Sequence, residues 1–334
     1  MRFLLDDEQR AFARSLDALL TAADTPSAVR SWSAGDHTAG RALWSRIADA
    51  GVFALAVPEA YEGVGPLPVE LAVAFVELGR HAVPGPLVET VAAAALLTEP
   101  DGLAKRFLPG LASGETVATV ALPGGGPYLL DGDAATVLLC VEGDELRLLH
   151  GHGPVRASMD PARRLTRPTQ PTRFTRQPGS GELLATGPHV TAAAARALVQ
   201  ARLATAAQAL GVGLTLLDRT VAYVKQRVQF GVPIGSFQAV KHQLADAKIA
   251  LEFARPLLFG AALSMDPADV AAAKVAACEA AYRTARTALQ LHGAIGYTAE
   301  YDLSLWLTKA RALRTAWGTP SACRELVLSG GARR

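Results

Sequence analysis

The sequence predicts a mainly α-helical protein with a small β domain in its middle. Apolar residues recur at helical spacing at both ends of the chain, and short β-branched apolar runs separated by Gly, Asp and Pro lie between them. The length of 334 residues corresponds to about two domains at about 150 residues each. We expect an N-terminal helical domain over residues 1–113, a short β domain over 114–188 and a C-terminal helical bundle over 189–334.

The N-terminal part contains the first helical patterns. DDEQRAFARSL offers Asp6 or Asp7 as an N-cap, and Leu16 and Leu20 follow on one stripe. The same spacing continues downstream, interrupted where Pro and Gly gather. Helices are predicted at 41–55, 68–83 and 86–99, and a loop at 57–68.

The middle part contains three short apolar runs that predict strands. They are TVATVAL (116–122), ATVLLCVEG (135–143) and ELRLLHG (145–151). Helical patterns then return at 191–229, 237–263, 267–291 and 300–314, with a last turn region near 320–329. The two central patterns are rich in Ala and Leu with polar residues at helical spacing, which is typical of a helix bundle with short connections.

Composition and charge exclude several classes of protein. The chain is 50% hydrophobic and 19% charged, so it can bury a large core and is not disordered. The net charge is only +2, and the densest basic stretch, residues 163–176, is interrupted by prolines and is interpreted as a solvated connection. A nucleic-acid partner is therefore not expected, because it requires clustered Lys and Arg.

Three cysteines, Cys140, Cys278 and Cys323, occur without a CxxC pair, which fits a reducing cytoplasm. No uncharged apolar run reaches 18 residues and the N-terminus is acidic, so we expect neither membrane insertion nor a signal peptide. His150 and His152 are too isolated to predict a zinc site, and no metal is expected.

Two segments at helix ends are candidates for ligand binding. In RVQFGVPIGSFQ (227–238), Arg227 offers a planar fork of donors suited to a diphosphate, and the glycines permit close approach of the backbone. In QLHGAIGYTAEYDL (290–303), a helix again ends in glycines. His292 in this segment is interpreted as a helix-end histidine interacting with the helix dipole, although it can also reach a nucleotide. Taken alone, each segment fits an ordinary helix connection.

Together, these segments resemble the C-terminal domain of the acyl-CoA dehydrogenase family, which carries Arg-x-x-Phe-Gly…Phe-Gln and, later, Gln-x-x-Gly-Gly-x-Gly-Tyr/Phe. LWSRIADAGVFALAVPEAYEGVG resembles the first domain of that family. The resemblance covers nearly the whole chain and is weakest in the middle. It implies an α-helical N-domain, a middle β-barrel and a C-terminal four-helix bundle.

The resemblance also implies FAD at a dimer interface, with the ADP half held by the C-terminal domain of the other subunit. By motif match, the cofactor-binding residues are Arg227, Phe230, Gln238, Gln290, Gly293 and Thr319. Ala294 replaces the second glycine of the family motif, a small change that still allows close approach.

The catalytic base of the family has no counterpart here. The family reaction removes an α-proton and a β-hydride from an acyl thioester; a buried glutamate takes the proton and flavin N5 takes the hydride. The usual glutamate precedes a Gly-Thr pair, where this chain reads RTAWGTPSACR and has Trp317. Other members place it before an arginine in the first long helix of the C-domain, where this chain has Ala201 before Arg202. By the same motif position, Arg202 is a candidate for contact with the pantetheine or acyl region.

The middle part departs from the family as well. The Thr-Glu-Pro…Gly-Ser-Asp segment, which holds the flavin ring and substrate in the family, is replaced by VATVALPGGGPYLL. The GGG run lacks a following helix with Lys-Ser/Thr, so it predicts a turn rather than a phosphate loop.

Three interpretations are consistent with these departures. In the first, favoured by the joint loss of base and ring-binding loop, the chain is the partner subunit of a heteromeric acyl-CoA dehydrogenase and holds the ADP half of FAD. In the second, it is a self-sufficient flavoenzyme with a relocated base, for which Glu252, Glu279 and Glu300 are candidates. In the third, a flavin-dependent monooxygenase or a structural paralogue uses the fold. We expect a cytoplasmic, oligomeric flavoprotein of lipid metabolism that acts on CH–CH groups of an acyl thioester with a homologous chain or with itself.

Overall fold

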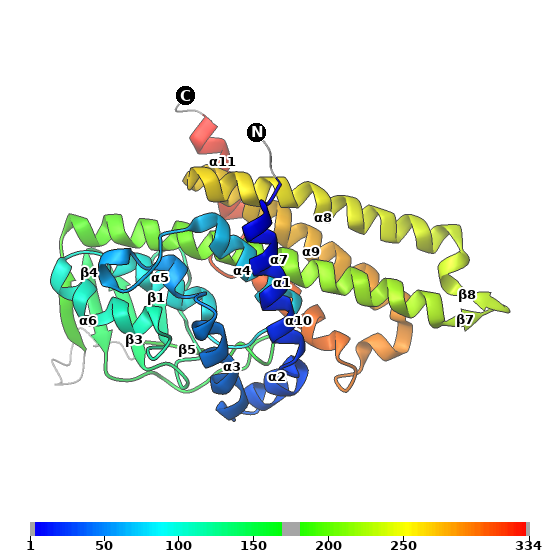
Figure 1. Ribbon diagram of the computed structural model, residues 1–334, viewed down its shortest axis with the longest axis horizontal. Coiled ribbons are helices and arrows are strands. Elements are labelled where there is room, and N and C mark those ends of the chain that lie inside the picture. Colours follow the sequence, from blue (N-terminus) through cyan, green and yellow to red (C-terminus); the bar gives the residue numbers. More distant parts are fainter. Residues whose placement is uncertain (1–3, 169–180, 332–334) are drawn as a thin grey trace.

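The computed structural model describes residues 4–168 and 181–331. The N-terminal helices and the strands gather in one half, and a long helical hairpin extends from them on the other side (Figure 1). The N-terminal helices are α1 (Asp7–Thr21), α2 (Thr25–Ser33), α3 (Thr38–Asp49), α4 (Pro68–Arg80), α5 (Leu87–Leu96) and α6 (Asp101–Ala112), with the short turns η1 (Ala54–Ala56) and η2 (Glu59–Tyr61).

Helix α1 begins at the predicted cap. The Asp6 carboxylate accepts the backbone N–H of Gln9 at 2.8 Å, and the Gln9 side-chain oxygen accepts the backbone N–H of Asp6 at 3.1 Å. This reciprocal pair is a capping box, which satisfies amides that lack partners inside the helix. Leu16 and Leu20 are buried in the main core, as the stripe predicted.

The described strands form a small β domain. They are β1 (Ala118–Ala121), β2 (Leu129–Leu130), β3 (Val137–Glu142), β4 (Glu145–Leu149), β5 (Leu165–Thr166) and β6 (Glu182–Thr186). Four of them make a sheet in the order β1-β3-β4-β6, in which β1 and β3 are parallel and the other pairs antiparallel, and β2 pairs with β5. The mainly helical fold with a small β domain is confirmed; the domain limits of 113/114 and 188/189 stay predictions.

The C-terminal part is the bundle. It comprises α7 (Pro188–Gln226), the hairpin strands β7 (Val228–Gln229) and β8 (Val232–Pro233), η3 (Ile234–Ser236), α8 (Gln238–Ser264), α9 (Pro267–His292), η4 (Gly293–Tyr297), α10 (Leu303–Leu313) and α11 (Pro320–Gly331). Helix α7 packs against α4 and α5 on one side and against α8 and α9 on the other. It therefore joins the N-terminal domain to the bundle.

The helix predicted to continue to residue 229 ends at Gln226 instead. Arg227 is its C-cap with extended backbone (ψ 116°), so the prediction that it lies in the last helical turn was wrong. Phe230 and Gly231 both have positive φ, at 53° and 80°. Two consecutive residues of this kind make the tight turn that suits a two-residue β-hairpin, and this turn stops the helix.

The basic stretch 163–176 also differs from expectation. The side chains of Arg163 and Arg164 are only 11% and 19% exposed, and Arg164 pairs with Asp133 at 2.6 Å. These two arginines therefore contact the protein rather than solvent, because Glu89 on α5 and Asp133 in the turn after β2 supply carboxylates. Residues 169–176, including Arg176, lie outside the described residues.

The three cysteines are buried and unpaired. Within residues 4–168 and 181–331, no helix is long and apolar enough to cross a bilayer.

Helices α4 and α7 cross with their backbones in direct contact. A Cβ added at Gly211 would lie 1.9 Å from the Val76 carbonyl oxygen, and one added at Gly79 would lie 2.0 Å from the Gln208 carbonyl oxygen. Both distances are far inside van der Waals contact, so only glycine permits this crossing. The glycines of VELGR and QALGVG therefore fix how the N-terminal domain sits on α7.

We expect Gly211→Ala to lower the free energy of unfolding by about 3 kcal/mol, because the helices must separate to accept the methyl group. Gly102→Ala in α6 is the matched control, since a Cβ there meets no atom within 4 Å. That variant should gain about 0.5–1 kcal/mol from helix propensity. Urea unfolding followed by circular dichroism measures both, and equal stability of the two variants would contradict the close crossing.

Candidate functional site

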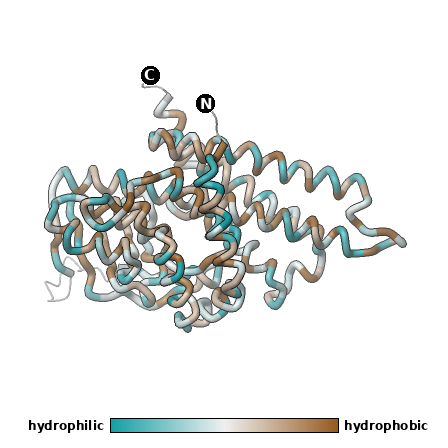
Figure 2. Tube along the Cα trace, viewed as in Figure 1, coloured by the Kyte–Doolittle hydropathy of each residue, from teal (hydrophilic) through white to brown (hydrophobic). Residues whose placement is uncertain are grey.

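The segment 227–238 forms the far tip of the helical hairpin (Figure 1). Arg227, Phe230 and Gln238 are all exposed there, and Phe230 is 91% exposed. Its ring meets Phe237 edge-on, with centroids 6.3 Å apart. Hydrophobic segments are visible on this projecting hairpin in Figure 2. The tip thus presents a guanidinium, an amide and an apolar aromatic that the described part of the chain leaves uncovered.

A groove of about 1210 Å³ runs between α8 and α9. Its α9 wall carries Arg283, Arg286, Gln290 and Gly293, whose spacing of three, four and three residues places them on one face of the helix. Gly293 has φ 62° and an open Cβ position, so its backbone is accessible to a ligand. The two arginines were missed in the sequence; their helical spacing from Gln290 is the signal that could have identified them.

The α8 wall of the groove begins with Gln243 and Asp246 and is apolar from Ala247 onward. Ile249, Phe253 and Leu257, each four residues from the next, are 52%, 70% and 49% exposed. A row of large exposed apolar side chains is unusual on the surface of a protein that does not bind another molecule there.

The predicted cofactor residues fall into three places. Gln290 and Gly293 line the groove, whereas Arg227, Phe230 and Gln238 belong to the hairpin tip and the start of α8. Thr319 lies apart from both, in the connection between α10 and α11, where its hydroxyl accepts the backbone N–H of Ala322 at 3.2 Å. The assignment of these residues to a cofactor stays a prediction.

Trp317 fills the position of the expected base. It is 5% exposed and follows α10 in a left-handed conformation with φ 59°. Its indole Nε1–H donates to Glu89 Oε1 at 3.2 Å. The ring lies against the GGG turn so closely that a Cβ added at Gly125 would lie 2.6 Å from it. The indole therefore occupies the space between α5 and this turn.

Two buried cations hold the backbone of the Trp317 turn. Arg202 is 8% exposed, and its Nε donates to the Trp317 carbonyl at 3.0 Å. Lys274 is 1% exposed, and its ammonium donates to the Gly318 carbonyl at 2.8 Å. Cations at the carboxyl end of a helix also interact favourably with the helix dipole. The Nε atom of Arg202 is therefore already hydrogen-bonded within the protein. Contact of Arg202 with a substrate stays a prediction.

Glu89, on α5, is a buried carboxylate that sequence reasoning missed. It is 3% exposed, and burial raises the pKa of its carboxyl, with Arg163 opposing the shift from 4.0 Å. Its Oε2 atom has no hydrogen-bond partner within the described part of the chain. The signal was a single acid in the apolar run PLVETVAAAALL, where an unpaired charge is unfavourable.

The three carboxylates considered as relocated bases lie elsewhere. Glu279 accepts Arg314 Nε at 2.9 Å, and Glu252 lies 3.7 Å from Arg255. Glu300 is exposed on the connection before α10.

His292 is buried at the end of α9. Its Nδ1 lies 2.7 Å from the Ala288 carbonyl oxygen and its ring stacks on Tyr223, with centroids 4.2 Å apart. Burial lowers the pKa of His292, so the neutral form, with its proton on Nδ1, is favoured. A charged histidine acting on the helix dipole is therefore disfavoured here.

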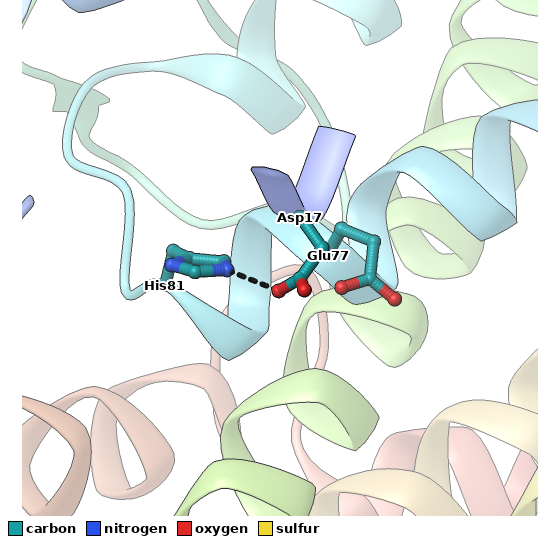
Figure 3. A group of neighbouring side chains, drawn as sticks. All are labelled: Asp17, Glu77 and His81. Carbon is teal, nitrogen blue, oxygen red and sulfur yellow. Dashed lines mark hydrogen bonds and ion pairs between the residues drawn. The ribbon is translucent and has the colours of Figure 1, made fainter. Parts of the chain in front are cut away.

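Asp17, Glu77 and His81 form the one group of potential metal ligands among residues 4–168 and 181–331 (Figure 3). His81 Nε2 already contacts Asp17 Oδ1 at 2.8 Å, and Glu77 lies 3.5 Å from Arg80. Burial raises the pKa of Glu77 to about 7. These contacts account for the group as ion pairs between α1 and the end of α4, and an adjacent guanidinium opposes cation binding.

Comparison with known proteins agrees with this architecture. Family models described as the N-terminal and C-terminal domains of acyl-CoA dehydrogenase match residues 6–115 and 191–330. The protein named acyl-CoA dehydrogenase IpdE2 of Mycobacterium tuberculosis is 35% identical over 309 residues, 91% of each chain. Its namesake of Mycolicibacterium smegmatis is 31% identical over 95% of this chain and 96% of its own.

Solved structures show the same fold over the full chain. The butyryl-CoA dehydrogenase of Megasphaera elsdenii superposes with a TM-score of 0.84 at 24% identity, covering 100% of both chains. A chain of the ChsE4–ChsE5 complex from Mycobacterium tuberculosis superposes with a TM-score of 0.83 at 26% identity, again over 100% of both chains. The protein therefore belongs to the acyl-CoA dehydrogenase family of flavoprotein oxidoreductases that act on CH–CH groups.

Proposed function

We propose that this chain is the subunit without a catalytic base in a heteromeric acyl-CoA dehydrogenase. A homologous partner chain supplies the glutamate, the flavin-ring pocket and the acyl pocket, and this chain binds the adenylate end of FAD. The observation that carries the proposal is Trp317. An indole nitrogen is only a donor, so it cannot take a proton from carbon, and this one is already engaged with Glu89.

The residues present fit the adenylate half of FAD. Arg283 and Arg286 bring two guanidinium groups to the groove, and the open backbone at Gly293 permits close approach. Arg227 and Gln238 are exposed on the tip, free to reach a cofactor that extends into a second chain. When bound, FAD supplies the hydride acceptor; the role of this chain is to hold and orient its diphosphate.

A homologous chain also suits the exposed apolar surface. Ile249, Phe253 and Leu257 on α8, together with Phe230 on the tip, present large side chains that a second chain can bury. One structural relative comes from a complex of ChsE4 with ChsE5. The relocated-base alternative has less support, because Glu252 and Glu279 are paired with arginines. We further propose a cytoplasmic location, consistent with three unpaired cysteines.

The test is to purify the chain alone and together with a homologous acyl-CoA dehydrogenase chain, and to record flavin absorbance and acyl-CoA-dependent dye reduction. Flavin and activity in the complex alone support the proposal. A yellow, acyl-CoA-oxidising protein without a partner would refute it.

In the complex, we expect Arg227→Ala to weaken flavin retention about 10- to 100-fold, because a charge-assisted contact contributes about 1.5–3 kcal/mol. Arg196→Ala is the control, since Arg196 is 47% exposed on α7 and lies only 3.8 Å from Glu99. Equilibrium dialysis of FAD measures both variants. Equal FAD retention by the two variants would show that Arg227 does not contact the cofactor.

A further inference from the structure

A second cavity, of about 420 Å³, lies where the three parts of the chain meet. Glu89 on α5, the 125–128 loop, residues 158–165 and the end of α10 with Trp317 form its wall. Much of the wall is apolar, contributed by side chains such as Leu130, Met159 and Leu165. It shares no lining residue with the groove between α8 and α9. Its volume suits a small organic molecule.

One polar group at this cavity is an incompletely bonded carboxyl. Glu89 accepts one hydrogen bond, from Trp317 at Oε1, while Oε2 has no partner within residues 4–168 and 181–331. Buried polar atoms are nearly always hydrogen-bonded, so an orphaned oxygen beside a cavity indicates a missing partner. Because burial raises the pKa of this carboxyl, its protonated form can donate a hydrogen bond.

A second polar group among those that line the cavity is the Arg163 guanidinium. Arg163 is 11% exposed, and its closest carboxylate oxygen, Glu89 Oε1, is 4.0 Å away, beyond hydrogen-bond distance. In the described part of the chain, this 4.0 Å approach to Glu89 is the side-chain contact that Arg163 makes. Arg311 lies at the rim, exposed, with its guanidinium 5.3 Å from the Tyr282 ring. A planar fork of donors on a cavity wall is the group that best recognises a carboxylate.

We propose that this cavity binds a small apolar monocarboxylate, whose carboxylate accepts hydrogen bonds from Arg163 and Glu89 while its apolar body packs against Trp317 and Met159. Such a ligand satisfies the guanidinium and the orphaned oxygen together. It leaves Glu89 protonated, since a carboxylic acid and a carboxylate share a proton readily when they are close. The proposal needs neither FAD nor a partner chain.

The experiment titrates the full-length chain with octanoate, and with octan-1-ol as a ligand of similar apolar body that lacks the carboxylate, by isothermal titration calorimetry. We expect saturable binding of one octanoate and at least 10-fold weaker binding of octan-1-ol. Arg163→Gln should weaken octanoate binding at least 10-fold and Arg163→Lys less, whereas Arg14→Gln, at an exposed position on α1, should leave it unchanged.

Glu89→Gln retains a donor at the orphaned position and should keep octanoate binding, whereas Glu89→Leu should lose it. Thermal unfolding of each variant establishes that it is folded, and Trp317 fluorescence, compared with Trp317→Phe, locates the ligand. Equal binding of octanoate and octan-1-ol would overturn the proposal. Unchanged octanoate affinity in both Arg163 variants would also overturn it, and would show that Arg163 and Glu89 interact only with each other.

Discussion

Lys309→Met is expected to lower the free energy of unfolding by about 3–5 kcal/mol, the cost of leaving one member of a buried ion pair without its partner. Lys309 on α10 and Asp160, in the segment before β5, are 3% and 2% exposed, with Nζ and Oδ2 3.3 Å apart. Among residues 4–168 and 181–331, Oδ2 has no hydrogen-bond partner, while Oδ1 accepts the backbone N–H of Ala162 at 3.0 Å, so Lys309 is the cation that compensates this buried charge. The ammonium also reaches the Val83 carbonyl at 3.5 Å. The single side chain therefore connects all three parts of the chain.

The matched control is Lys105→Met. Lys105 and Asp101 form an exposed pair on α6, with 70% and 62% of their side chains accessible and a separation of 2.7 Å. Solvent screens such a pair, so its loss should destabilise the protein far less than the loss of Lys309. Urea unfolding compares the two variants, and Lys309→Met with Asp160→Asn in the same chain should recover part of the loss. A Lys309→Met protein as stable as Lys105→Met would show that Asp160 needs no cation.

The sequence predicted features that depend on local spacing. The N-cap of α1 at Asp6 or Asp7, the Ala-rich helices of the bundle and the strand runs follow from periodicity and from residues close in sequence. The hairpin at residues 228–233 was missed because its signal is a left-handed Phe230, and a non-glycine residue rarely adopts that conformation. The residue types at 227–229 favour a helix, but the turn at Phe230 and Gly231 ends the helix before them.

The candidate site was predictable only where a motif is local. The prediction that Trp317 and Ala201 replace the base rests on the residues that flank them, and the prediction for the glycine segments rests on local motifs as well. The contact between Glu89 and Trp317 spans 228 residues, and no periodicity encodes it. Arg163 was misinterpreted for the same reason: the carboxyl that it faces lies on a helix of another domain.

Trp317→Ala is expected to lower the free energy of unfolding by about 3–5 kcal/mol, because removal of a buried indole leaves a cavity that α5 and the turn at Gly125 cannot close. Gly125 would lose the ring that lies against it, and Glu89 would lose its one hydrogen-bond donor. Trp317→Phe is the matched comparison, since it keeps an aromatic ring and removes the N–H. That variant should cost about 1–3 kcal/mol, the penalty for an unsatisfied buried acceptor.

Urea unfolding of Trp317→Ala and Trp317→Phe distinguishes the contribution of packing from that of the hydrogen bond. Flavin retention by the same variants tests whether Trp317 belongs to the cofactor site. Neither variant provides a proton acceptor, so neither should give the chain acyl-CoA oxidation of its own. Flavin retention in the complex should survive Trp317→Phe and fall in Arg227→Ala, because the indole and the hairpin tip lie in different parts of the bundle. If Trp317→Phe released flavin as readily as Arg227→Ala, the indole would belong to the cofactor site, and this chain would hold more of FAD than its adenylate.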